Sequence, residues 1–208
     1  MKTLQIFLLL VALSFRSYCQ SENDGTLRAG HAPGNDYLLK IVKSYFRSDP
    51  YRNEFGPFLK HMLNDPILVN KTMQKKTDSS LFSFKGKYKD YNPFSFQADS
   101  TEIRLVEKEY LIDDSSALKD TLFVYQLLGY SNGKNGLEAV KDEFSKFNRH
   151  YGKHFIVESS DVKNGTELVG ARADYFVPDA GPSPLTVGWA KLDDIQNAFV
   201  ITLRVKRE

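Results

Sequence analysis

The sequence predicts a single α+β domain over residues 37–208, built on a mainly antiparallel sheet with its helices on one face. Three observations predict this class. Some stretches repeat apolar residues three and four apart, as helices do, most of the remaining chain alternates as strands do, and an Asn-Gly pair separates two strand-like runs. Asn-Gly between extended runs is a strong hairpin signal, and hairpins give antiparallel pairing. We expect about six to seven strands and one long helix.

Ahead of this domain, residues 1–19 have the anatomy of a secretory signal peptide. Lys2 supplies a positive start, residues 6–13 form an uninterrupted apolar run, and Cys19 is a small residue directly before Gln20. We expect cleavage between Cys19 and Gln20. The protein is then secreted, or it resides in the periplasm or cell envelope.

The same segment has two alternative fates, a membrane anchor and a lipid anchor. Its apolar run is about half of the roughly 20 residues that a membrane-spanning helix needs, so we predict no transmembrane anchor. A lipid on Cys19 is the other alternative. It is disfavoured because Arg16 and the bulky Tyr18 stand where small or aliphatic residues are expected.

The segment also contains the only cysteine and two of the 28 basic residues, whereas the chain has 26 acidic residues. The part after residue 19 is therefore electrically balanced and has no thiol. A balanced charge gives no reason to expect nucleic acid or an anionic membrane as a partner. The absence of cysteine excludes a disulfide scaffold, a thiol enzyme and a cysteine-ligated metal site in that part.

Residues 20–36 are polar and contain almost no large apolar side chain, so we expect a flexible leader there. Helical spacing then predicts a helix over residues 37–46, with Asp36 as its N-cap. A second, shorter helix is expected over residues 58–63, between two prolines. The stretch 67–76 is interpreted as a continuation of that helix.

Strand-like alternation follows the helices. Residues 82–88 predict a strand with one face in water, and residues 102–112 predict another. The apolar phase of the second strand slips between Leu105 and Val106, which we interpret as a β-bulge. Residues 121–130 are apolar on both alternating sets, which predicts a central strand covered on both faces.

One long amphipathic helix is predicted over about residues 135–151. Apolar residues recur there three and four apart, Asn135 is a suitable N-cap, and Gly152 stands where a helix ends. A β-meander follows. Its four strands are expected over residues 154–162, 166–177, 185–192 and 198–206.

The familiar catalytic and metal-binding motifs are broken in this chain. Residues 129–135 join a strand to a helix as a phosphate-binding loop does, but the glycines are too close and Asn135 replaces the magnesium-binding hydroxyl. His150 and His154 have the spacing of zinc ligands, but Gly152 is predicted to end the helix between them and to separate the rings. We predict neither a metal nor a cofactor.

Aromatic side chains make up 13% of the chain, and four of them form the candidate binding site. Most aromatic side chains fill cores, but Tyr91, Phe94 and Phe96 surround a predicted loop, and Trp189 lies on a later strand. If the four converge at one rim, they form a ligand pocket or a partner surface. The pattern assigns no catalytic residue.

The leading hypothesis for function is an exported, non-catalytic domain that binds an unknown protein or small molecule. One alternative is a secreted or periplasmic hydrolase, in which folding assembles acids such as Glu107 and Glu109 with a histidine such as His154. A second alternative is a structural subunit of an envelope assembly. Two sequons, at Asn70 and Asn164, accept glycans only in a host that glycosylates asparagine.

Overall fold

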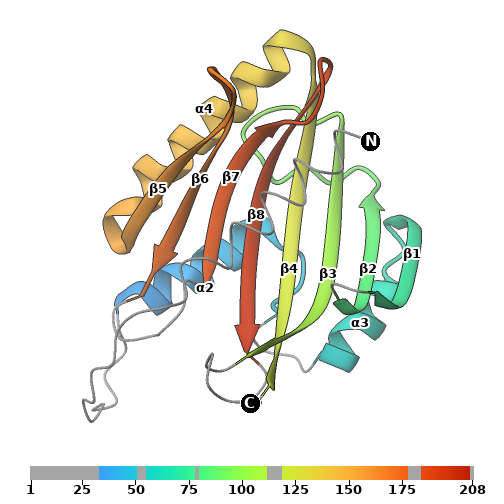
Figure 1. Cartoon of the computed structure of the whole chain (residues 1–208). Helices are drawn as coiled ribbons and strands as arrows, with labels where there is room; N and C mark the ends of the chain where they lie inside the picture. Colours follow the sequence, from blue (N-terminus) through green and yellow to red (C-terminus); the bar gives the residue numbers. More distant parts are fainter. Residues whose placement is uncertain (1–32, 51–54, 78–79, 112–118, 178–183, 207–208) are drawn as a thin grey trace.

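The computed structural model describes residues 33–50, 55–77, 80–111, 119–177 and 184–206. Within these ranges the chain forms eight strands and three α-helices (Figure 1). The α+β class and the large antiparallel sheet are confirmed, although the sheet has eight strands and not the expected six to seven. The expected signal peptide, its cleavage site at Cys19 and most of the expected leader lie outside the described residues.

Two antiparallel meanders make up the sheet. The first contains β1 (Leu68–Thr77), β2 (Ser80–Tyr88), β3 (Ser100–Leu111) and β4 (Lys119–Asn132). The second contains β5 (Ile156–Asn164), β6 (Glu167–Phe176), β7 (Leu185–Lys191) and β8 (Gln196–Lys206). Helix α4 (Gly133–Tyr151) and the short 3₁₀ helix η2 (Gly152–His154) connect them. The strand order is β1-β2-β3-β4-β8-β7-β6-β5, so β8 pairs with β4 in the middle of the sheet.

Helices α2 (Pro33–Tyr45), α3 (Phe55–Asn64) and α4 lie on one face of the sheet, behind it in Figure 1. The main core fills the space between them and the strands. Ile41 of α2, Met62 of α3 and Val140 of α4 are fully buried there. Burying a side chain of this size stabilises the fold by roughly 1.5–3 kcal/mol. None of the described helices is long and apolar enough to cross a membrane.

The prediction of helix over residues 67–76 is wrong, because this stretch forms strand β1. Leu68 is buried, whereas Val69 and Met73 are 39% and 53% exposed. In a strand at the edge of a sheet, both apolar and polar side chains can be exposed to water. The sequence of such a strand then lacks the alternation of apolar and polar residues by which a strand is recognised. Asn70, at φ 52°, interrupts the pattern further with a shift in register against β2.

The β-bulge expected between Leu105 and Val106 is absent from the described strand. The register of β3 with β4 is continuous, with Leu105 opposite Tyr125 and Val106 opposite Val124. Leu105 is fully buried on the helical face, and Val106 lies on the other face. The consecutive apolar residues therefore lie on opposite faces of one regular strand, and do not mark a slip of the chain.

All three predicted helix starts are too late, since α3 also begins at Phe55 and not at residue 58. Helix α2 begins at Pro33, so Asp36 lies in its first turn, where a carboxylate favours the positive end of the helix dipole. Helix α4 begins at Gly133, so Asn135 lies inside the helix and not at its N-cap. The predicted end is confirmed, because the last helical residue, Tyr151, directly precedes Gly152.

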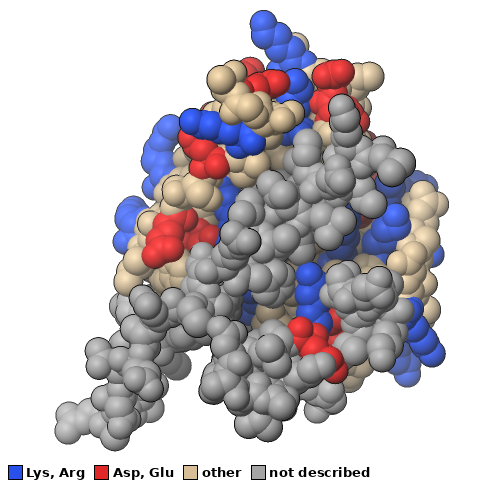
Figure 2. Space-filling model, in the orientation of Figure 1, with Lys and Arg blue, Asp and Glu red and all other residues tan. Residues whose placement is uncertain are grey.

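The sheet face opposite the helices carries a row of hydrogen-bonded polar side chains. The register aligns Gln126, Thr202, Thr186 and Asp174 on four neighbouring strands. Gln126 Nε2 donates to Thr202 Oγ1 at 3.3 Å, Arg204 Nη1 donates to Thr186 Oγ1 at 2.6 Å, and Thr186 Oγ1 donates to Asp174 Oδ1. Such pairing avoids the roughly 1–3 kcal/mol that an unsatisfied buried polar group costs. Figure 2 views this face, and basic side chains gather on its β1–β2 side.

The loop between β2 and β3 is held against the sheet by one phenyl ring. Phe94 is 7% exposed, and its ring lies edge-on to Phe199 of β8 with centroids 5.6 Å apart. The ring lies directly over Gly129 of β4, where an added Cβ would be 2.3 Å from Phe94 Cε2. The absence of a side chain at Gly129 therefore makes room for the loop.

We predict that Gly129→Ala destabilises the protein by about 1–3 kcal/mol, because the new methyl group displaces Phe94 from the sheet. Urea unfolding followed by circular dichroism measures the change. Gly56→Ala in α3 is the matched control, since a Cβ there meets nothing within 4 Å, and alanine favours a helix over glycine. Equal effects of the two substitutions would contradict the prediction.

Phenol groups are buried in several parts of the core. Burial raises the pKa of Tyr125, of Tyr175 and of Tyr130, in the last case to about 12. The neighbouring Arg104 guanidinium opposes the shift at Tyr130. The folded protein therefore keeps these phenols protonated at a pH at which unfolded tyrosines ionise.

We predict that the free energy of unfolding changes little up to about pH 9 and falls as the pH rises from about 10 to 12. Below the unfolded pKa both states bind the phenol protons, and above it only the folded state does. Each phenol then removes up to about 1.4 kcal/mol per pH unit. Urea unfolding across this range measures the slope, which Tyr125→Phe should reduce. Unchanged stability at pH 12 would refute this account.

Candidate functional site

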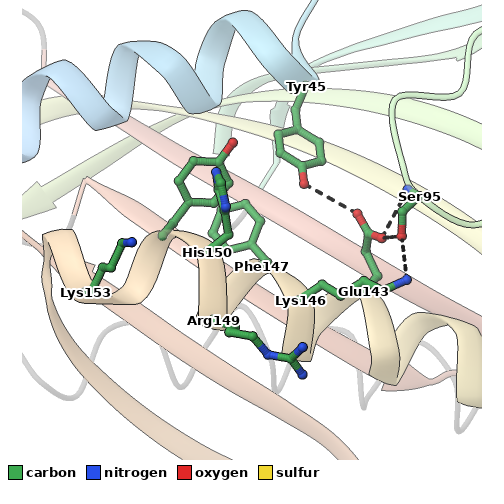
Figure 3. A pocket seen from close by; sticks show the side chains of 9 residues that line it. Tyr45, Ser95, Glu143, Lys146, Phe147, Arg149, His150 and Lys153 are labelled. Atoms are coloured by element: carbon green, nitrogen blue, oxygen red, sulfur yellow. Dashed lines mark hydrogen bonds between the residues drawn. The ribbon is translucent and has the colours of Figure 1, made fainter.

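A pocket of about 430 Å³ lies between the C-terminal half of α4, the end of α2 and the loop between β2 and β3 (Figure 3). Its volume is within the range of small-molecule sites, and its mouth is open to solvent. Aromatic and charged side chains line it. They are Tyr45, Ser95, Glu143, Lys146, Phe147, Arg149, His150, Tyr151 and Lys153.

The elements around the pocket position its inner residues. Glu143 and Phe147 are one turn apart on the buried face of α4. Tyr45 is the last residue of α2, and its ring packs on Phe147 with centroids 5.7 Å apart. Ser95 lies between Phe94 and Phe96, whose rings stack with centroids 5.3 Å apart. Packing of these two rings therefore holds the small hydroxyl against α4.

Glu143 is the acid at the inner end of the pocket, and it is only 3% exposed. Its Oε1 accepts a hydrogen bond from Tyr45 Oη at 3.4 Å. Its Oε2 accepts from the backbone N–H of Ser95 at 3.1 Å and from Ser95 Oγ. The carboxylate thus joins α4, α2 and the loop, and each of its oxygens accepts at least one hydrogen bond.

Tyr45 remains a donor over a wide pH range. Burial raises its pKa, and the negative charge of Glu143 raises it further. The phenol therefore stays protonated at neutral pH and keeps its bond to the carboxylate.

The outer part of the pocket is basic. Lys146 forms an ion pair with Asp142, at 2.7 Å between Nζ and Oδ2, and its Nζ also donates to Ser95 Oγ at 3.3 Å. Arg149 and Lys153 form no ion pair with any acid among the described residues. His150 is exposed, and no acid among those residues pairs with it. Three positively charged side chains and one buried carboxylate therefore line the pocket.

His150 and His154 have different surroundings, in line with the predicted separation of their rings. His150 lines the pocket, edge-on to Tyr151 at 4.5 Å between centroids. His154, in η2, stacks on Tyr37 of α2 at 3.3 Å between centroids. The described residues contain no group of three or more His, Cys, Asp or Glu side chains that could hold a metal ion.

Two backbone N–H groups at the β4–α4 junction have partners within the chain. Asn132 N donates to Asp99 Oδ2 at 2.8 Å, and Gly133 N donates to the Ile195 carbonyl at 2.6 Å. Gly133 has a φ of 71°, which turns the chain from strand into helix. This junction therefore acts as a turn, and a carboxylate of the chain itself occupies the amide that would face a phosphate.

The four aromatic residues proposed from the sequence do not line this pocket. Tyr91, Phe94 and Phe96 lie together in the β2–β3 loop and pack against the core. Tyr91 Oη donates to the Tyr45 carbonyl at 3.0 Å, so it helps to hold the end of α2 beside the pocket. Trp189 is 4% exposed on β7, beside Phe199 of β8. A ligand role for these four residues stays a prediction.

The sequence analysis missed the inner residues of the pocket, although one signal pointed to them. Glu143 falls on the same helical row as Val140 and Phe147, and an acid on an apolar row indicates a buried carboxylate that needs partners. Its partners Tyr45 and Ser95 are 98 and 48 residues away in the chain. No local pattern indicates contacts at such separations.

We predict that Glu143→Ala lowers the free energy of unfolding by about 2–4 kcal/mol, because it leaves Ser95 N and the Tyr45 hydroxyl without their acceptor. Asp142→Asn, at the exposed neighbouring position, should cost about 0.5 kcal/mol through loss of its surface ion pair with Lys146. Urea unfolding of both variants measures the difference. If Glu143→Ala costs no more than Asp142→Asn, the carboxylate does not tie the three segments together.

The site has to be interpreted from its own geometry. Comparisons of this chain with models of protein families, with curated proteins and with solved structures found no match. The lining side chains, their charges and their hydrogen bonds are therefore the basis for the function proposed next.

Proposed function

We propose that the protein is an exported, non-catalytic binding domain that holds a small ligand in the pocket between α2 and α4. The state of Glu143 carries the proposal. This side chain is the one acid among the lining residues, and both of its oxygens accept hydrogen bonds from Tyr45 and Ser95. A general base must reach the proton that it abstracts, whereas this carboxylate is only 3% exposed and is bound by two neighbouring residues. Its burial favours a binding role for the pocket.

The remaining candidate acids lie far from the remaining candidate histidine. Glu107 and Glu109 are on β3, whereas His154 directly precedes β5. Five strand-to-strand steps of about 4.8 Å separate β3 from β5, so these groups are on the order of 24 Å apart across the sheet. None of the three lines the pocket. This arrangement favours binding over the hydrolase alternative.

The shape and composition of the pocket also support binding. Tyr45, Phe147 and Tyr151 provide aromatic surface, and exposed basic side chains provide donors at the mouth. Ligand sites in proteins commonly combine an apolar wall with a few placed polar groups.

We predict that the protein, purified under native conditions from its source, retains a small molecule that native mass spectrometry detects. His150→Trp should remove or weaken this adduct, because the larger ring fills the pocket. His61→Trp on α3 is the matched control, since His61 is exposed and does not line the pocket. Retention of the molecule by His150→Trp at the wild-type level would place the ligand elsewhere, and absence of any adduct would count against a binding domain.

A further inference from the structure

The charges around the pocket are unbalanced. Lys146, Arg149 and Lys153 carry three positive charges, against one negative charge on Glu143 and one on Asp142, the ion-pair partner of Lys146. One positive charge is therefore in surplus even when His150 is neutral, and Arg149 and Lys153 are the two cations outside that ion pair. Figure 3 shows Lys153 and Lys146 at opposite ends of the lining, with His150 between them. The negative charge of Glu143 is further offset by the donors that it binds.

The helix dipole explains only part of this charge. Arg149 and His150 lie in the last turn of α4, where a positive charge stabilises the negative end of a helix by about 0.3–1 kcal/mol. Lys153, however, follows the helix, and Lys40 comes from α2, with its Nζ 4.3 Å from the centroid of the Tyr37 ring. Positive charge therefore converges on this region from two helices and from η2.

The same positive charges affect the pKa of His154. Its ring stacks on Tyr37, next to Lys40. Partial burial lowers the pKa of His154, and the positive charges of Lys153, Lys40 and His150 lower it further. The space between α2 and the end of α4 thus repels a further cation and attracts an anion.

The inner wall has a different character. The buried Phe147 ring packs between Tyr45 and Tyr151, with centroids 5.7 Å and 4.8 Å away, and the two half-buried tyrosines present the aromatic surface. An inorganic ion would leave this surface uncovered. A ligand with an apolar body covers it while its charged group stays at the basic mouth.

We infer that the ligand is a small organic anion, a carboxylate or a phosphate monoester, whose charged group is held by His150 and Lys153 and whose apolar body lies on Tyr45 and Tyr151. This inference rests on the proposed function and specifies its ligand. Lys146 serves as a second cationic contact at the Ser95 end. Figure 3 shows the Arg149 guanidinium directed away from Tyr45, so Arg149 does not contact the ligand. Its charge only adds to the positive electrostatic potential at the mouth.

The test is a nuclear magnetic resonance titration of the folded full-length chain with anionic and neutral probes of matched shape. Benzoate and hexanoate are the carboxylates, phenyl phosphate and hexyl phosphate are the phosphate esters, and benzamide and hexanamide are the neutral controls. At least one anionic probe should shift the amide signals of Ser95 and His150, with its neutral counterpart about tenfold weaker. The class that binds more tightly, carboxylate or phosphate ester, identifies the charged group of the ligand.

Salt and inorganic phosphate sharpen the result. Binding should weaken between about 20 and 300 mM sodium chloride, because salt screens exposed charges. Inorganic phosphate should bind more weakly than phenyl phosphate, because it cannot cover the aromatic wall. Equal binding of the two phosphates, or binding that is insensitive to salt, would overturn the inference.

Charge-neutral variants locate the contact. We predict that Lys153→Gln and His150→Gln each weaken the best anionic probe by about fivefold, the effect of a partly exposed ion pair. Lys134→Gln is the matched control, because Lys134 is exposed at the other end of α4 and outside the lining. Equal losses in all three variants would show an effect of net charge alone and would overturn the assigned contact.

The outcomes separate the two proposals. Neutral probes that bind at Ser95 and His150 as tightly as their anionic counterparts overturn the anion inference and leave the binding function in place. Probes of both classes that shift no pocket signal at millimolar concentration overturn the inference as well. If the protein purified from its source then also carries no small molecule, the proposed binding function is refuted as well.

Discussion

The pairing of β4 with β8 is the constraint on which the rest of the structure depends. Eleven consecutive residue pairs join the first meander to the last strand of the second. The chain must therefore leave the middle of the sheet after β4, reach the far edge and return strand by strand. The 19 residues of α4 rise about 28 Å, and four steps of about 4.8 Å separate β4 from β5. One helix is long enough for this crossing, and its inward row must be apolar because it lies across the central strands.

The pocket follows from that crossing. Helix α4 passes over β8, β4 and β7, and its C-terminal half lies beside the end of α2. The β2–β3 loop reaches the same place because Phe94 is seated on Gly129. A buried carboxylate, Glu143, then joins the three segments through Tyr45 and Ser95. The hydrogen bonds that fix the architecture thereby hold the acid inside the fold, while Lys146, Arg149 and Lys153 are exposed to solvent.

Local patterns in the sequence predicted most of the fold and little of the site. The long helix and the β5–β6 hairpin follow from apolar spacing and from turn residues, which act within a few positions of one another. Strand β1 could not be predicted in this way, because an edge strand with exposed Val69 and Met73 shows no alternation. The apparent bulge at Val106 arose because Leu105 and Val106, although both apolar, lie on opposite faces of a regular strand. The contacts of Glu143 join residues far apart in the chain, so only its place on an apolar row was visible beforehand.

The two outermost strands have a consequence for how the domain meets other copies of itself. An open sheet exposes unpaired backbone groups at its edges, and these invite another strand to add on. The positive φ of Asn70 breaks the line of β1, and exposed Lys75 would be brought against any added chain. Strand β5 is exposed along most of its length and includes Glu158 and Asp161. Two copies joined through their β5 edges would therefore bring like charges together, and a strand added to β1 would meet an irregular backbone.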